Sequence, residues 1–101
     1  MIKYTMHVTD YTNAKFMMKP EIIKESTYVE KEEAVNAFKA WCEAIINNMA
    51  SCGLQVKIHR IAEIDFDDDE YEFTVLIYGM RNMDVVCDYG VYLKVIKEIE
   101  T

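Results

Sequence analysis

The chain has 101 residues, 51% of them hydrophobic, and its 18 acidic and 11 basic side chains give a net charge of −7 at pH 7. This length and composition predict one globular domain over residues 1–101 and exclude a disordered chain, which would contain few hydrophobic residues. The acidic balance disfavours direct binding to nucleic-acid phosphates, because such binding needs clustered lysine and arginine.

The cysteines and the N-terminal sequence indicate the compartment. Cys42, Cys52 and Cys87 are odd in number and have no CxxC spacing. We therefore expect buried, reduced thiols, and neither a disulfide framework nor a zinc site, since His7 and His59 lie on other segments. No apolar run approaches the roughly 20 residues that span a bilayer, and the N-terminus lacks the apolar stretch of a signal peptide. We expect a cytoplasmic protein with no cofactor, no bound metal and no membrane contact.

Two strands are predicted first. Residues 2–8 alternate between apolar and polar side chains, which is typical of a half-buried strand. A segment rich in turn formers follows, and then Glu21 to Tyr28 is β-branched and aromatic enough for a second strand, with Pro20 suited to its beginning or to an edge position. Thr27 and Glu30 have the spacing of a helix capping box, unless the strand continues one residue further.

The strongest pattern predicts an amphipathic helix over residues 30–52. Its apolar residues recur at spacings of three and four, which places them on one helix face. They are Ala34, Val35, Phe38, Trp41, Cys42, Ile45, Met49 and Cys52. Glu30, Glu32 and Glu33 crowd the first turn, where carboxylates complement the helix dipole. Gly53 is placed to end the helix in the left-handed conformation.

After Gly53 the apolar period changes from 3.6 to 2, which predicts a β-hairpin. One apolar set is Leu54, Val56, Ile58, Ala62, Ile64 and Phe66, interrupted by Arg60, and the other is Tyr71, Phe73, Val75 and Ile77. If Phe66 lies opposite Tyr71, the turn is Asp67 to Glu70, Arg60 lies opposite Ile77, and both sets face one side of the sheet.

The other face of this hairpin is a candidate contact surface. The same register pairs Asp65 with Glu72, Glu63 with Thr74, Ile61 with Leu76, and His59 with Tyr78. Ile61 and Leu76 would form an apolar patch, which another element of this chain or a partner would cover.

The C-terminal stretch from about residue 84 to 99 allows two interpretations. Apolar residues at helical spacing fit a helix capped near Asn82 or Asp84, although Gly90 weakens a helix by about 1 kcal/mol relative to alanine. Alternatively, alternating residues around Leu93 form a strand. We favour the helix, and the predicted fold is then α+β in the order ββαββα, with an antiparallel sheet of about four strands.

Residues 65–72, DFDDDEYE, hold six carboxylates. Without them, 12 acidic and 11 basic side chains would leave a charge of only −1. A calcium site is disfavoured, because the EF-hand spacing of the first aspartates stops there: Glu70 stands where that loop needs glycine, and Leu76 where it needs glutamate. Catalysis is disfavoured as well, since a solvated tip gives carboxylates similar environments and no nucleophile or phosphate-binding motif is present.

Two interpretations of this acidic hairpin remain. In the first, the charge only keeps a solvated hairpin soluble. In the second, the charge has a function. Asp65 and Glu72 would lie opposite each other and repel, and a hairpin that tolerates this repulsion is expected to use its charge. The carboxylates would then stand in for nucleic-acid phosphates and contact a groove lined with lysine and arginine. Tyr71, Tyr78 and His59 would supply aromatic anchors.

In size, charge and lack of catalytic motifs, the chain resembles the small acidic inhibitors that phages encode against host nucleases, anti-CRISPR proteins among them. The resemblance is one of general character, and it implies a viral, non-enzymatic inhibitor of a basic nucleic-acid-binding protein, such as a nuclease. The predicted partner-binding residues are Asp65, Asp67, Asp68, Asp69, Glu70, Glu72, Tyr71, Tyr78 and His59.

The alternative function is a structural or assembly module. It would form a homodimer or larger homo-oligomer through the Ile61–Leu76 face or through an edge strand. Tyr11, Tyr28, Met17 and Met18 are harder to place in the core by periodicity, and either edge packing or such a contact would account for them.

Overall fold

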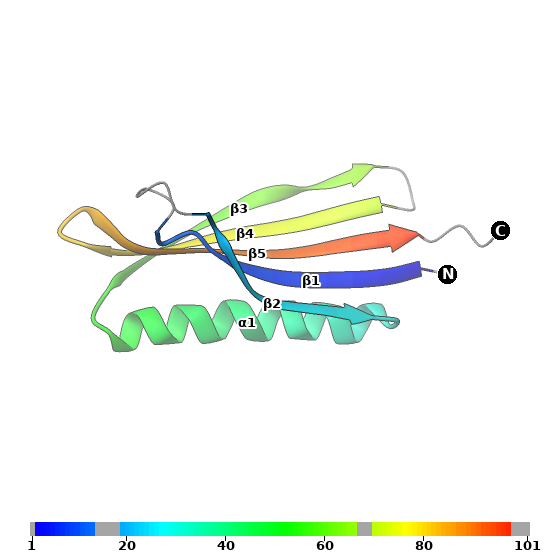
Figure 1. Cartoon of the computed structure of the whole chain (residues 1–101), viewed down its shortest axis with the longest axis horizontal. Coiled ribbons are helices and arrows are strands. Elements are labelled where there is room, and N and C mark those ends of the chain that lie inside the picture. Colours follow the sequence, from blue (N-terminus) through cyan, green and yellow to red (C-terminus); the bar gives the residue numbers. More distant parts are fainter. Residues whose placement is uncertain (1, 14–18, 67–69, 98–101) are drawn as a thin grey trace.

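The computed structural model describes residues 2–13, 19–66 and 70–97; for residues 2, 61–66, 70–72, 96 and 97 the description is of the backbone. The described chain forms five strands and one helix (Figure 1). In chain order they are β1 (Ile2–Asp10), β2 (Glu21–Tyr28), α1 (Lys31–Ser51), β3 (Gln55–Phe66), β4 (Glu70–Arg81) and β5 (Asp84–Lys97). The strands form one antiparallel sheet in the order β2-β1-β5-β4-β3, so the predicted α+β class is confirmed.

The first three predicted elements are confirmed. Strand β2 has the predicted bounds, β1 continues to Asp10, and α1 spans Lys31–Ser51. Gly53 follows the helix with φ +76°, as expected for a left-handed stop. The capping box is wrong: Thr27 belongs to β2, and Glu30 precedes the helix with an extended backbone and no side-chain cap. Within the described part of the chain, no helix is long and apolar enough to cross a membrane.

The predicted C-terminal helix is wrong, because this segment is strand β5. Strand β5 is the central strand, with β1 on one side and β4 on the other. Val91, Leu93 and Val95 alternate into the core and are 0%, 1% and 4% exposed. A central strand also carries apolar residues on its second face. The two faces together produce spacings of three and four, which resemble a helix pattern.

Helix α1 covers one face of the sheet and creates the core there (Figure 1). The buried residues of this core are Met6 and Val8 from β1, Ala34, Ile45 and Met49 from α1, Ile77 from β4, and Val91 and Leu93 from β5. Since side chains alternate along a strand, the residues between these on the strands lie on the opposite face. We call that opposite face of the sheet the far face.

The β3–β4 hairpin is confirmed, but its predicted register is wrong. Phe66 lies opposite Glu70 and not Tyr71. The register shifts between Ile61 and Ile64, which is the signature of a β-bulge, and before this point Arg60 lies opposite Val75. The predicted register assumed an uninterrupted alternation and therefore missed the bulge. The partner of Arg60 on β4 is thus two residues away from the predicted partner, Ile77. A shift of two residues keeps Arg60 on the predicted face of the sheet, because side chains alternate with a period of two.

The molecule is elongated, with extents of 53 × 28 × 22 Å. Figure 1 shows that α1 begins at the same end of the long axis at which β3 ends and β4 begins. The β4–β5 turn lies at the opposite end. Arg81 pairs with Asp84 there, and Asn82 and Met83 form the turn with φ +52° and +71°.

Candidate functional site

The acidic segment lies at one corner of the sheet. Asp65 is at the end of β3, which is an edge strand, and Glu70 and Glu72 are at the start of β4. Asp67, Asp68 and Asp69 lie outside the described residues. Glu30, Glu32 and Glu33, at the start of α1, are exposed at the same end of the molecule, with Lys31 between them (Figure 1). Two separate segments thus bring carboxylates to one end of the long axis, which we call the acidic end.

The predicted opposition of Asp65 and Glu72 is wrong. Asp65 lies opposite Tyr71, and Glu72 lies opposite Ile64 on β3. On its other side, Glu72 has Lys94 of β5 as its register partner. Asp65 and Glu72 therefore do not repel each other as directly paired residues of β3 and β4. Their repulsion was an argument that the acidic charge has a function, and this argument no longer applies. Glu72 is also the least suitable contact residue of the set, since its register neighbour is basic.

The three predicted aromatic anchors lie in two separate places on the hairpin. Tyr71 belongs to the acidic end, whereas His59 and Tyr78 lie on the far face and further along the hairpin. Tyr78 is eight residues from Glu70, which at the rise of a strand is about 26 Å. His59 lies opposite Leu76, and Tyr78 lies opposite Lys57, so these two anchors are not paired as predicted. The structure does not gather all the predicted contact residues into one site.

A cluster of aromatic rings on the far face was missed by sequence reasoning. His7 and Tyr92 are register partners, and their rings stack with centroids 4.5 Å apart and planes 14° apart. The Tyr11 and Tyr92 hydroxyls form a hydrogen bond. These residues come from both ends of the chain, and only the β1–β5 pairing brings them together. We call His7, Tyr11 and Tyr92 the aromatic cluster.

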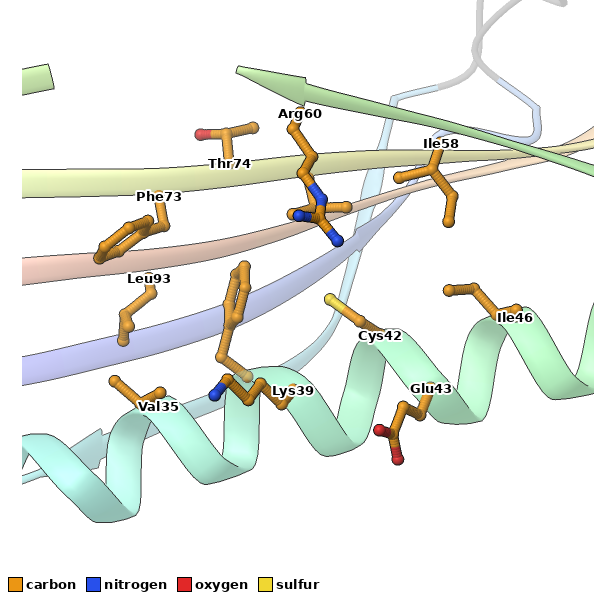
Figure 2. A pocket seen from close by; sticks show the side chains of 12 residues that line it. Val35, Lys39, Cys42, Glu43, Ile46, Ile58, Arg60, Phe73, Thr74 and Leu93 are labelled. Carbon is orange, nitrogen blue, oxygen red and sulfur yellow. The ribbon is translucent and has the colours of Figure 1, made fainter. Parts of the chain in front are cut away.

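Sequence reasoning also missed a cavity of about 510 Å³ between α1 and the sheet (Figure 2). Its apolar walls include Val35, Phe38 and Ile46 from α1, and Ile58, Phe73 and Val75 from β3 and β4. In the sequence, the sign of this cavity was Arg60, which interrupts the alternating apolar residues of β3.

Arg60 and Cys42 give the cavity its polar chemistry. Figure 2 shows Arg60 directed from β3 toward α1, with the Cys42 sulfur on the facing side of the helix. Burial raises the pKa of the Cys42 thiol to about 11, although the Arg60 charge acts in the lowering direction. Lys39 and Glu43 also line the cavity, and Figure 2 shows the Glu43 carboxylate turned away from the strands.

The described residues contain no group of three or more histidine, cysteine, aspartate or glutamate side chains placed to hold a metal ion.

The carboxylates of Asp10 and Asp88 lie near each other on β1 and β5, at the end of the molecule opposite the acidic end. There, burial and the neighbouring Asp10 raise the pKa of Asp88. Asp10 Oδ1 accepts a hydrogen bond from the Thr12 backbone N–H at 2.8 Å, which holds that carboxylate in place.

The fold is thus an α+β arrangement in which one helix covers one face of a five-stranded antiparallel sheet. Comparisons with protein-family models, with curated proteins and with solved structures found no match.

Proposed function

We propose that the protein is a non-enzymatic, cytoplasmic binding protein that blocks a basic nucleic-acid-binding partner through its acidic end. The observation that supports this most is the concentration of charge. Six of the 18 acidic side chains fall in residues 65–72, and three exposed glutamates at or just before the start of α1 lie at the same end of the molecule. A partner groove lined with lysine and arginine is attracted to such a surface. The viral, inhibitor-like character noted above belongs to the same proposal.

The hairpin backbone suits the imitation of a phosphate chain. A strand rises about 3.3 Å per residue and its side chains alternate between the two faces, so carboxylates two residues apart present a row of negative charges about 7 Å apart on one face. Strand pairing holds the backbone up to Phe66 and from Glu70 onward. The backbone at Asp65 and at Glu70 is therefore held in place by strand pairing, and preorganisation of this kind lowers the entropy cost of binding.

The contact set is narrower than the sequence predicted. Its charged members are Asp65, Glu70 and the three aspartates 67–69, with Tyr71 as the aromatic anchor. Glu72 contributes less, because Lys94 is its register partner. His59 and Tyr78 contribute only if the partner also extends along the far face, about 20 Å from Asp65 to His59 and about 26 Å from Glu70 to Tyr78.

The test is a charge-removal experiment with a matched control. Asp67, Asp68 and Asp69 are replaced by asparagine, and the control variant carries Glu21→Gln, Glu25→Gln and Asp84→Asn, three exposed carboxylates away from the acidic end. Tagged proteins capture partners from host lysate at rising salt, and the nucleic-acid binding of each captured protein is then measured. The proposal expects that the parent and the control inhibit this binding, that the first variant does not, and that added salt weakens capture. Equal inhibition by all three proteins contradicts it.

A second candidate is a homo-oligomeric assembly module, and the edge strand β2 favours it. Ile22 and Ile23 of β2 are 57% and 42% exposed. An edge strand with unpaired backbone groups and exposed apolar side chains is a template for pairing with another copy. This candidate expects a dimer in light scattering that persists at high salt and that Ile22→Lys dissociates. A monomer at high concentration rejects it.

A further inference from the structure

The cavity beneath α1 has the dimensions and lining of a small-molecule site. Its volume of about 510 Å³ lies within the range of roughly 300–1,000 Å³ found for ligand pockets. Val35, Phe38 and Ile46 form one wall, and Ile58, Phe73 and Val75 form the other. Such sites are mostly apolar and contain a few polar groups that orient the ligand.

Arg60 is the polar group that this cavity directs at a ligand. It lies on the cavity face of β3, two residues after Ile58, and Figure 2 shows its side chain reaching toward α1. Arg60 and Ile58 are both exposed, so they form the solvent-open side of the cavity. Within the part of the chain that the structure describes, the Arg60 guanidinium has no hydrogen bond and no ion pair, although its charge acts on the Cys42 thiol. A guanidinium presents five donors in a fixed plane, a geometry that matches a carboxylate with two parallel hydrogen bonds.

The surroundings of Arg60 leave the cavity positively charged. Cys42 faces it, but burial keeps this thiol protonated at neutral pH, so it supplies no competing anion. Lys39 adds a second cation to the lining. The carboxylate of Glu43, the acidic residue in the described lining, is turned away from the strands in Figure 2. A cation at the side of an apolar cavity is complementary to an amphipathic anion.

We propose that this cavity binds an aliphatic monocarboxylate. The apolar chain lies between α1 and strands β3 and β4, and the carboxylate accepts hydrogen bonds from the Arg60 guanidinium, with Lys39 contributing charge. This site is independent of the proposed function, because the cavity and the acidic residues 65–72 involve different side chains.

The experiment is a titration of the full chain with decanoate, followed by methyl NMR. Two probes separate the contributions: decanol has the chain without the charge, and acetate has the charge without the chain. We expect saturable shifts at the methyl groups of Val35, Ile46, Ile58 and Val75 with decanoate, weaker binding of decanol and no binding of acetate. Arg60→Met should weaken decanoate binding about tenfold or more and leave decanol unchanged.

Two further variants keep the test decisive. Lys57→Met removes the same charge from the other side of β3 and should bind decanoate as the parent does. Cys42→Phe fills the cavity while Arg60 is kept, and it should abolish binding; circular dichroism checks the fold of each variant. Decanoate shifts confined to other methyl groups, equal binding by Arg60→Met and the parent, or a dimer that buries Ile58 in place of any ligand would each overturn the proposal.

Discussion

The Tyr92 ring lies over Gly90, two residues earlier on the same strand. A Cβ atom placed on Gly90 would come within 2.7 Å of the Tyr92 ring and 2.9 Å of the Tyr11 ring. Tyr92 in turn stacks on His7 and shares a hydrogen bond with Tyr11. The missing side chain at position 90 therefore makes room for the aromatic cluster, which joins the two ends of the chain on the far face.

Gly90→Ala should lower the free energy of unfolding by about 1–3 kcal/mol, because the new methyl group displaces both tyrosine rings. Urea denaturation of the parent and the variant measures the change. Adding Tyr11→Ala to Gly90→Ala removes one of the two obstructing rings, so the alanine at position 90 should cost less in that background. An equal cost in both backgrounds would mean that the glycine matters for its backbone and not for the cluster.

Met83→Gly should stabilise the protein by about 0.5–1 kcal/mol. Asn82 and Met83 both have positive φ in the two-residue β4–β5 turn. Asparagine tolerates this conformation, whereas methionine is strained there and glycine is preferred. Met83 is 92% exposed, so its side chain contributes little packing. The urea midpoint measures the gain, Met83→Ala serves as the control that keeps the strain, and a loss of stability for Met83→Gly would contradict the prediction.

Local pattern was enough to predict α1, whose apolar residues follow one repeat from beginning to end, and local composition was enough to predict β2, which is rich in β-branched and aromatic residues. It failed for β5, where apolar residues on both faces of a central strand imitate helical spacing. It also failed for the hairpin register, because the bulge between Ile61 and Ile64 depends on pairing and not on local composition. The aromatic cluster and the Arg60 cavity share this limitation: each unites residues from different elements, and their positions follow only from the sheet order.

Cys42 should be the slowest of the three cysteines to react with iodoacetamide. The thiolate is the reacting species, and a pKa of about 11, raised by burial, leaves only about one thiolate in a thousand at pH 8. Cys52 is exposed and should react first. Peptide mass spectrometry over time measures each site. Because the Arg60 charge lowers the pKa of Cys42, Arg60→Met should slow Cys42 further. Alkylation of Cys42 as fast as that of Cys52 would contradict this account.

Asp88→Asn should stabilise the protein at neutral pH and not at low pH. Burial, together with the Asp10 charge, raises the pKa of Asp88 above its ordinary value. The folded state therefore holds the proton more tightly than the unfolded state does. The stability from this group is present below the unfolded pKa of about 3.9 and is lost as pH rises through the folded pKa.

Asparagine at position 88 cannot ionise, so the Asp88→Asn variant does not lose this stability as the pH rises. Thermal unfolding at pH 7 should show a higher midpoint for Asp88→Asn than for the parent, and the difference should shrink toward zero near pH 3. Asp84→Asn, at the exposed start of β5, is the control for a charge change on the same strand. The backbone hydrogen bonds of residue 88 to Tyr11 and Thr12 are kept in the variant. A gain of equal size at both pH values would therefore point to side-chain packing and not to the ionisation of Asp88.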